Sequence, residues 1–370
     1  MSSESAHTWP ALISSLLAGR DLDAEAVQWA MDEVMSGEAP PAALAGFLVA
    51  LESKGAGVQE VKALADTMLA HARPLTAPVG AVDIVGTGGD GVHSVNISTM
   101  SAIVIGGAGY PVVKHGNRAS SSRSGSADVL DELGVRLDVP VERVEQIAHE
   151  VGITFCFAQT FHPSMRFAVE ARRSIAVPTV FNVLGPLTNP GRVQANAIGV
   201  ASARLAPVLA GVFAERGGSA LVFRGQDGLD ELSIAGASDV WEVRDGSILT
   251  HEVHPSDVGL DAAGIDTLRG GSPAFNADVA RAVFAGHRGP VRDAVVLNSA
   301  AGIVAARGLR DGLSADQAKD SFVDRMREAA REAEASIDSG AAERLLVRWA
   351  AATQQQGASQ ADLVHPLPVI

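Results

Sequence analysis

The pattern of apolar residues changes after Arg73 and Pro74, and this change restricts the folds that the chain can adopt. Between residues 9 and 72, apolar side chains recur every three or four positions, which indicates amphipathic helices. Beyond Pro74, short apolar runs such as 81–85 and 111–113 alternate with glycine turns and helical stretches, as in α/β proteins. The sequence therefore predicts a small helical unit followed by an α/β unit.

The α/β unit carries enough strand signals for a central sheet. Residues 240–253 alternate around Arg244-Asp245-Gly246, which is typical of a hairpin. Helical stretches separate the other strands, so the sheet should be mostly parallel. We predict a small α-helical domain at residues 1–75, joined by helices around 162–195, and an α/β domain at residues 76–370. Further strands are expected at 153–158, 195–200 and 220–223.

Composition and charge exclude several classes of protein. With 370 residues and 47% hydrophobic content, the chain can bury a sizeable core. Its longest apolar runs are shorter than the roughly 20 residues that a membrane helix needs, and its net charge of -14 opposes nucleic-acid binding. The single cysteine, Cys156, cannot form an internal disulfide, and residues 1–10 lack an export leader. We therefore expect a cytoplasmic protein without membrane or nucleic-acid partners.

A glycine-rich turn at residues 86–91 follows the first predicted strand and precedes a helix that begins near Asn96. Glycine lets the backbone approach phosphate oxygens, and amides at a helix start point toward an anion. The turn also matches the G-x-G-x-x-G pattern of dinucleotide sites, in which the next strand should end in an acidic residue. Here that strand ends in Lys114, which argues against a dinucleotide. By itself the turn indicates either a phosphate site or a purely structural turn.

A second run, residues 114–122, combines three basic side chains with several hydroxyl groups in a predicted loop after the second strand. This composition favours phosphate binding, although a solvated basic loop has the same composition. Loops that follow neighbouring parallel strands meet at one edge of the sheet, where α/β proteins bind ligands. We therefore predict that the glycine turn and the basic loop form one phosphate site.

Two further features indicate ligands. Asp230 and Glu231 are adjacent carboxylates after a predicted strand and could hold magnesium, although an acidic surface turn looks the same. Arg172 and Arg173 lie on a predicted helix, where an arginine can bind a carboxylate, and their spacing does not distinguish them. His115 can either accept a proton or make a simple hydrogen bond.

The chain contains, in this order, the strings GTGGD, NIST, KHGNR, SGSADVL, FNVLGPLTNP and DGLDE. Together they resemble the anthranilate phosphoribosyltransferases. The resemblance implies a small helical domain and a larger α/β domain of the nucleoside phosphorylase and phosphoribosyltransferase type, assembled as a homodimer. It also implies transfer of the phosphoribosyl group of phosphoribosyl pyrophosphate (PRPP) to the amine of anthranilate, with two magnesium ions, in tryptophan biosynthesis. The products would be N-(5-phosphoribosyl)anthranilate and pyrophosphate.

The resemblance also assigns site residues. Lys114 and Arg172 would be catalytic: Lys114 would stabilise the departing pyrophosphate, and Arg172 would face the carboxylate of anthranilate. Magnesium would be held by Ser98, Asp230 and Glu231. The residues implied to bind the substrates are Gly86, Gly89, Asp90, Ser94, Asn96, Ile97, Ser98, Thr99, Lys114, His115, Gly116, Asn117, Arg118, Ala119, Ser120, Ser121, Ser122, Ser126 and Arg172.

Two places depart from the commonest family pattern. Ser94 replaces threonine and keeps the hydroxyl, whereas Gln159 and Phe161 replace proline and tyrosine near the expected entrance for anthranilate. A pyrimidine-nucleoside phosphorylase shares the fold class but needs no magnesium, so Asp230 and Glu231 favour the transferase. A non-catalytic relative that binds nucleic acid should have a basic surface, which the net charge of -14 disfavours.

Overall fold

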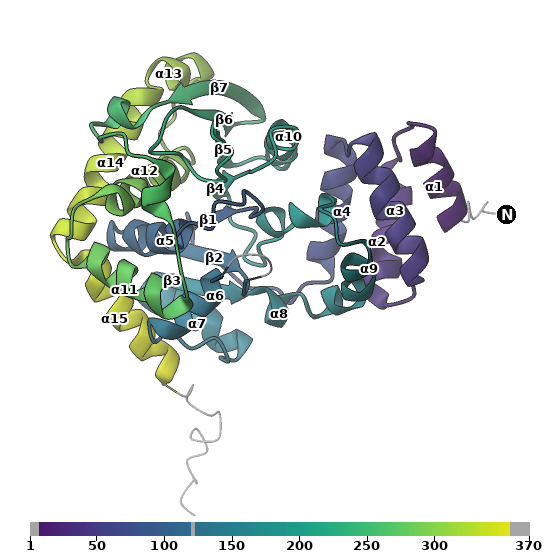
Figure 1. The fold of residues 1–370 in the computed structure, drawn as a ribbon, viewed down its shortest axis with the longest axis horizontal. Coiled ribbons are helices and arrows are strands. Elements are labelled where there is room, and N and C mark those ends of the chain that lie inside the picture. The colour runs from purple at the N-terminus through teal and green to yellow at the C-terminus, as the bar shows by residue number, and fades with distance from the viewer. Residues whose placement is uncertain (1–6, 120–122, 356–370) are drawn as a thin grey trace, which may run out of the picture.

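The structure, a computed structural model, describes residues 7–119 and 123–355 of the chain. A bundle of helices lies at one end and a larger α/β portion at the other (Figure 1). The predicted fold class is confirmed, because the α/β portion is built around one mostly parallel sheet. Among the described helices, none has the length and apolar character needed to cross a membrane.

The first four helices form the bundle, and their ends follow from the sequence. Thr8 and Asp23 cap two of them, accepting hydrogen bonds from the amides of Ala11 (3.4 Å) and Ala26 (2.8 Å). Gly37 ends the second helix in the left-handed region, with φ of 83°. The helices are α1 (Trp9–Leu17), α2 (Ala24–Ser36), α3 (Pro41–Lys54) and α4 (Val58–Ala70).

Seven strands form a single sheet in the order β3-β2-β1-β4-β5-β6-β7. The first five strands are parallel to one another, whereas β6 pairs antiparallel with β5 and forms a hairpin with β7 at one side, as the sequence predicts. The strands are β1 (Val82–Gly86), β2 (Val112–Gly116), β3 (Ile153–Phe157), β4 (Ala195–Gly199), β5 (Ser219–Gly225), β6 (Ser238–Arg244) and β7 (Ser247–Val253).

Strand β2 is longer than the sequence predicts. Its pairing with β3 continues through Lys114, His115 and Gly116, so the prediction that these three residues belong to a loop is wrong. The strand can continue because its buried polar side chains form hydrogen bonds with backbone carbonyl groups. The Lys114 ammonium group donates to the carbonyl oxygen of Ile84, and a ring nitrogen of His115 lies 2.9 Å from the carbonyl oxygen of Gly185.

Helices cover both faces of the sheet. Helices α5 and α12 pack on one face with α14 and α15 outside them, whereas α10 packs on the other face and also contacts α4 (Figure 1). The helices are α5 (Ile97–Gly107), α6 (Ser126–Glu132), α7 (Val141–Val151), α8 (Ala158–Phe161), α9 (Val169–Ile175), α10 (Ala206–Arg216), α11 (Pro273–Phe284), α12 (Pro290–Arg307), α13 (Ala315–Asp320), α14 (Phe322–Asp338) and α15 (Ala341–Gln354). Short 3-10 turns are η1 (Pro163–Ala168), η2 (Val180–Asn182), η3 (Gly185–Leu187), η4 (Pro255–Val258) and η5 (Ile265–Leu268).

Two hydrophobic cores lie on opposite faces of the sheet. Successive residues of β5 alternate between them: Leu221 and Phe223 enter the core under α5 and α12, and Ala220 and Val222 enter the core under α10. The second core runs on through α10 and the segment around η2 into the helical bundle. The bundle and the sheet therefore share one continuous apolar interior.

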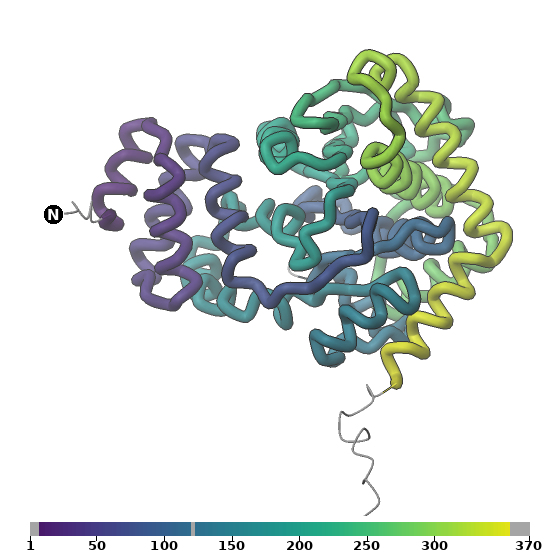
Figure 2. Tube along the Cα trace, turned by 180° about the vertical axis from the view of Figure 1, so that it is seen from behind, coloured from purple at the N-terminus to yellow at the C-terminus, as the bar shows by residue number. Residues whose placement is uncertain are grey.

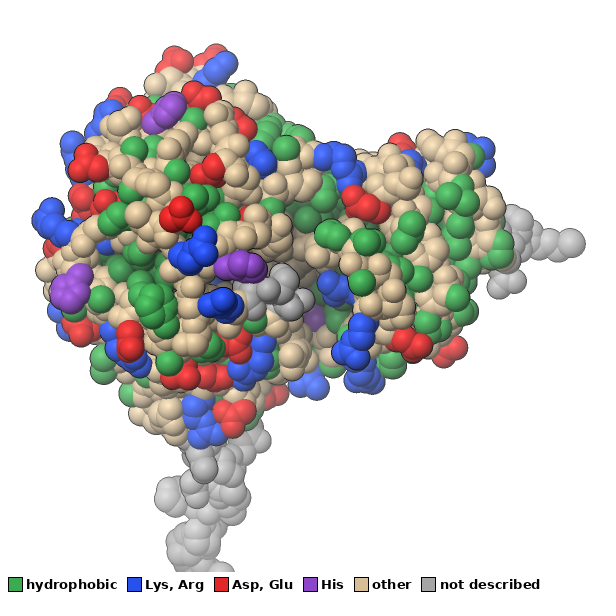
Figure 3. Space-filling view, viewed as in Figure 1, with side chains coloured by type: hydrophobic (Ala, Val, Ile, Leu, Met, Phe, Trp, Pro, Cys, Tyr) green, Lys and Arg blue, Asp and Glu red, His purple; other side chains and the backbone are tan. Residues whose placement is uncertain are grey.

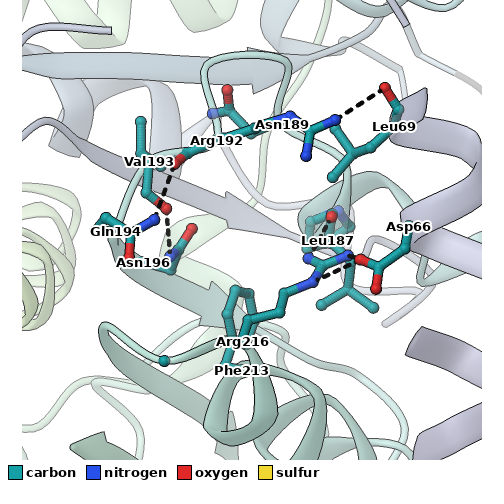
Figure 4. A pocket seen from close by; sticks show the side chains of 12 residues that line it. Asp66, Leu69, Leu187, Asn189, Arg192, Val193, Gln194, Asn196, Phe213 and Arg216 are labelled. Atoms are coloured by element: carbon teal, nitrogen blue, oxygen red, sulfur yellow. Dashed lines mark hydrogen bonds and ion pairs between the residues drawn. The ribbon is translucent and has the colours of Figure 1, made fainter. Parts of the chain in front are cut away.

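The chain segment after α4 and the side chain of Arg216 connect the bundle to the α/β portion. Residues 71–81 run from α4 to β1 (Figure 2), and the amide of Arg73 donates to the carbonyl oxygen of Phe161 at 2.9 Å. A cavity of about 220 Å³ lies beside α4 and α10. Arg216 donates there to the Asp66 carboxylate and to the carbonyl oxygen of Leu187, at 2.6 Å each (Figure 4). These polar contacts fix the position of the bundle.

A buried carboxylate ties the hairpin to α14. Glu242 on β6 accepts two hydrogen bonds of 2.8 Å from Arg325, and it also contacts Arg244 (3.2 Å) and His251 (3.0 Å). Burial by itself would raise the pKa of Glu242, but these hydrogen bonds and the nearby arginine charge lower it to about 2.

Replacing Glu242 with glutamine should destabilise the protein near pH 7 by about 3 kcal/mol, because the partly buried Arg325 loses its anion and Arg244 keeps only Asp311. Folding lowers the pKa of this carboxyl, so its stabilisation is present above pH 4.5 and is lost as the pH falls toward about 2. In urea unfolding, the difference between Glu242→Gln and the parent protein should shrink over that interval. Glu252→Gln, at an exposed position of β7, is the control, and an equal loss in both variants would contradict the role of Glu242.

Candidate functional site

The carboxyl ends of β1, β2 and β4 meet at one edge of the sheet, and the predicted phosphate-binding residues gather there. Gly86 ends β1, and Gly88 and Gly89 follow with φ of 70° and 87°. Both are exposed, so their backbone is open to a ligand. Figure 3 shows a hollow between the bundle and the α/β portion, with basic side chains around it. The glycine turn and the described part of residues 114–122, called the basic segment from here on, therefore follow or end neighbouring strands, as predicted.

Asp230 reaches the glycine turn from the loop after β5. Its Oδ2 accepts a hydrogen bond from the amide of Gly88 at 2.6 Å. A Cβ atom at Gly86 would collide with the Asp230 carboxylate, and one at Gly199, the end of β4, would collide with its backbone carbonyl. Both positions therefore require glycine. Sequence analysis missed Gly199, whose only signal was its place near the end of a predicted strand.

Three carboxylates lie close together beside the turn. Burial, together with the nearby charge of Asp90, raises the pKa of Asp230 to about 7. Burial also raises the pKa of Glu231 well above its ordinary value, and Asp230 adds to the rise while Lys114 opposes it. Crowded, buried carboxylates of this kind are relieved when a cation binds between them.

This donor set fits magnesium that is shared with a phosphate ligand. The amide of Ser98 hydrogen-bonds to Glu231, which places the start of α5 beside the acids. Within residues 7–119 and 123–355, no three His, Cys, Asp or Glu side chains form a complete metal site. Magnesium is commonly bound by one or two carboxylates, with water and substrate phosphates supplying the other ligands. An incomplete protein shell is therefore what such a site requires.

Asn298 of α12 fixes the loop that carries the acids. Its Oδ1 accepts from the amide of Leu232 (2.8 Å), and its Nδ2 donates to the carbonyl oxygens of Leu232 (3.0 Å) and Ala294 (2.9 Å). The side chain is fully buried, so these bonds do not compete with water. Sequence analysis gave Asn298 no role, although a polar residue within an apolar helical stretch was a usable signal.

Lys114 is enclosed, with no exposed surface. Its ammonium group donates to the carbonyl oxygen of Ile84 and lies 3.3 Å from the hydroxyl of Ser98. Burial lowers the pKa of Lys114, whereas Asp83 and Glu231 raise it. Burial in turn raises the pKa of Asp83 to about 6, against the opposing effect of Lys114. Asp83 is thus a counter-charge for Lys114. Sequence analysis missed Asp83, although an acidic residue inside an apolar run was a usable signal.

Asn96, just before α5, connects the start of that helix to the residues that precede α6 and to α11. Its Nδ2 donates to the carbonyl oxygen of Ser124 (3.1 Å), and its Oδ1 accepts from Asn276 of α11 (2.8 Å). Asn276 is buried and also accepts from the amide of Gly271 at 2.8 Å. Asn276 therefore orients Asn96, and no signal in the sequence pointed to this contact.

The other predicted residues near the start of α5 differ in their access to a ligand. The side chain of Ile97 is in the core, and its amide already donates to a neighbouring carbonyl oxygen at 2.7 Å. The Thr99 hydroxyl is buried without a hydrogen-bond partner in the described part of the chain. Ser94, which bridges to Arg269 through its backbone, and Ser98 are partly exposed. The hydroxyls of Ser94 and Ser98 are thus the more accessible ones.

The basic segment is described only in part, because Ser120, Ser121 and Ser122 lie outside the described residues. Arg118 is exposed and pairs with the carboxylates of α6, with its guanidinium 2.8 Å from Asp128 and a similar distance from a second aspartate. A phosphate at Arg118 would therefore compete with these acids.

The residues on either side of that gap form a compact turn. Asn117 is exposed and accepts from the amide of Ala127 through its backbone oxygen (3.2 Å). The amide of Ala119 donates to Asp128 at 2.9 Å. A Cβ atom at Gly116 would lie 3.4 Å from the Cβ of Ser126, so the strand end and the start of α6 are in contact.

Two buried histidines lie against each other beside this segment. The rings of His115 and His162 are 5.0 Å apart, and a nitrogen of His162 is 2.8 Å from the carbonyl oxygen of Thr188. Burial lowers the pKa of His115 to about 3, with His162 adding to the effect, and burial lowers the pKa of His162 to about 4. Both rings are therefore neutral at pH 7. His115 makes a structural hydrogen bond, and His162 was given no role in sequence analysis.

Arg172 lies on α9, which packs against α3 of the bundle. Its side chain is half-buried, whereas Arg173 is exposed. No hydrogen bond or ion pair reaches the Arg172 guanidinium from the residues that the structure describes, and burial lowers its pKa. A half-buried cation without a partner favours an anionic ligand.

Known families match both parts of the chain. The family described as "Glycosyl transferase family, helical bundle domain" matches residues 10–72, and "Glycosyl transferase family, a/b domain" matches residues 79–343. The fold and the site at the sheet edge thus define a transferase of this glycosyl transferase family.

Individual relatives are more specific. The anthranilate phosphoribosyltransferase of Arthrobacter sp. (strain FB24) is 56% identical over 94% of this chain and 97% of its own. The crystal structure of the enzyme of that name from Thermus thermophilus covers 93% of this chain and 99% of its own, at 39% identity and a TM-score of 0.84. The one from Saccharomyces cerevisiae in complex with PRPP and Mg covers 95% and 99%, at 28% identity and a TM-score of 0.82. The chain belongs to the anthranilate phosphoribosyltransferases, and its activity is theirs, in tryptophan biosynthesis.

Gly199→Ala should lower kcat by about a hundredfold, because the new methyl group displaces Asp230 and misplaced groups cost about that much. The rate can be followed by the loss of anthranilate fluorescence, with thermal unfolding as a check on the fold. Gly236→Ala is the matched control, since a Cβ at Gly236 would meet nothing within 4 Å. Full activity of Gly199→Ala would show that the contact with Asp230 is unimportant.

Proposed function

We propose that PRPP binds along the glycine turn and the basic segment, that Ser98, Asp230 and Glu231 hold magnesium, and that Arg172 binds the carboxylate of anthranilate. The observation that carries this proposal is the enclosed cation of Lys114 beside buried carboxylates, at the edge where the glycine backbone is exposed. A site that combines a cation, crowded acids and free amides suits a ligand that brings both phosphate and metal. The other site residues predicted from the sequence keep their proposed roles in binding PRPP.

Within this proposal, the chain acts mainly on the departing pyrophosphate. Lys114 is held by a backbone carbonyl and by Ser98, so its charge does not need to reorient as the bond to the sugar breaks. The exposed amides near Gly89 offer further donors. When bound, magnesium supplies positive charge that offsets the charge developing on the pyrophosphate.

The acceptor needs orientation more than activation. The amine of anthranilate is neutral at pH 7, so the proposal requires no strong base before attack. His115 is buried and neutral, with its pKa lowered to about 3, and is therefore a poor base. Arg172, on an element that contacts the bundle, would instead hold the carboxylate and direct the amine toward the sugar.

Arg172→Ala should raise the KM for anthranilate by about tenfold or more and leave the KM for PRPP nearly unchanged, because a charge-assisted contact with one substrate is lost. Steady-state kinetics with each substrate varied in turn would measure this split. Arg173→Ala, one residue along the same helix and exposed, is the control. Equal increases for both substrates would rule out the role given to Arg172.

We also propose two magnesium ions. The support is electrostatic: Asp90, Asp230 and Glu231 bring three carboxylates near one lysine, and the pyrophosphate adds further negative charge.

Removal of metal by a chelator should abolish activity, and Asp230→Asn or Glu231→Gln should lower kcat/KM by about a hundredfold or more. Binding of manganese with PRPP present, followed by electron paramagnetic resonance, should give two equivalents for the parent protein. Asp245→Asn, in the exposed turn of the hairpin, should behave like the parent. A single equivalent in the parent protein would overturn the proposal of two ions.

The division into domains at residues 1–75 and 76–370, with the helices around 162–195 completing the smaller one, remains our proposal. It is supported by the packing of α9 and η1 on bundle helices. We likewise propose a homodimer that associates through the helical bundle. Leu17 and Val49, on α1 and α3, are 72% and 47% exposed and would be covered there.

A further inference from the structure

A second cavity lies at the edge of the sheet opposite the phosphate site. Its volume is about 730 Å³, within the range of small-molecule pockets. Val79 and Gly80 come just before β1, and Tyr110 and Pro111 come just before β2, so these walls lie at the amino ends of the strands. The opposite wall is formed by the carboxyl end of α12, the residues that follow it, and α14. The cavity thus lies at the amino end of β2, whereas Lys114 is in the middle of that strand and the phosphate site is at its carboxyl end.

Most charged groups around this cavity are already paired. Arg325 binds Glu242, and Asp311 accepts two hydrogen bonds from Arg244. Arg307 contacts Glu328 at 3.3 Å and also binds the hydroxyl of Tyr110. These pairs leave little charge for a ligand to satisfy.

Arg310 is the exception among the charged residues of the wall. It is exposed, and within the described ranges no hydrogen bond or ion pair reaches its guanidinium. The guanidinium lies against the backbone of Gly80, at the other side of the cavity. One unpaired cation over the mouth favours a ligand with a single negative charge.

The remaining wall is apolar and aromatic. Val79, Pro111, Val304 and Leu313 offer aliphatic surface, and the ring of Tyr110 stands among them. The Tyr110 hydroxyl is held by Glu332 (3.0 Å) and Arg307 (3.0 Å), which fixes the ring. A rigid aromatic ring beside aliphatic groups suits a flat apolar body of modest size.

We infer that this cavity is a second binding site, which takes a small aromatic monocarboxylate with its ring against Tyr110 and its carboxylate on Arg310. The site is distinct from the acceptor site at Arg172. It involves the segment that enters β1 and the residues that enter β2, both outside the catalytic machinery.

Tyr110 provides the test, because it is the only tyrosine in the chain. Protein labelled with fluorotyrosine therefore gives one fluorine NMR signal, and that signal reports on this cavity. Titration of the full-length protein with 2-naphthoate should shift it saturably. The neutral 2-naphthalenemethanol, which has the same rings, should bind at least about fivefold more weakly, as expected for loss of one exposed charge contact.

Matched variants decide where the probe binds. Arg310→Ala should weaken the binding of 2-naphthoate by about fivefold. Arg331 is an exposed residue of α14 away from the cavity, so Arg331→Ala should leave this binding unchanged. Arg172→Ala should leave the titration unchanged. The inference is overturned if the signal does not move, if acid and alcohol bind equally, if Arg310→Ala has no effect, or if Arg172→Ala abolishes the shift. Calorimetry on unlabelled protein should give the same affinities. If calorimetry detects no binding of 2-naphthoate, the inference is also overturned.

Discussion

The enclosed charge of Lys114 sets the arrangement of the groups around it. A lysine without water needs both an anion and hydrogen-bond acceptors, and here they come from separate parts of the chain. Asp83 on β1 and Glu231 after β5 supply the negative charge, and the carbonyl oxygen of Ile84 accepts a hydrogen bond. Because a loss of any one partner leaves a buried charge, the strands that carry them are held in register at the site.

The ligand-facing loops are held from behind by amide side chains. Asn298 of α12 binds the backbone just after the two acids, and Asn276 of α11 orients Asn96. Neutral amides suit this task because they can donate and accept at once without adding charge to a site that is already crowded with ions. The loops can therefore remain open to substrate while their attachment to the α/β core stays rigid.

The sequence predicted the parts of this structure that depend on local pattern. Helical periodicity predicted the bundle, and the glycine turn and Asp230, both singled out from the sequence, lie together at one edge of the sheet. The sequence pattern placed Lys114 in a loop, because a charged residue ends an apolar run. In the structure, β2 continues through Lys114 because residues distant in the sequence supply its counter-charges. The roles of Gly199 and Asn276 depend on contacts with Asp230 and Asn96, and such contacts leave no trace in spacing.

The apolar interior shared by the bundle and the sheet constrains how the chain can be divided or exchanged. A fragment that stops at residue 75 would contain all four bundle helices, yet their interior also uses residues from 168 to 213 and one face of β4 and β5. Such a fragment would leave that surface exposed to solvent. Recombination between relatives would therefore have to exchange the bundle together with α10 and the sheet face that packs on it. Otherwise a bundle from one parent would have to fit α10 and the sheet of the other.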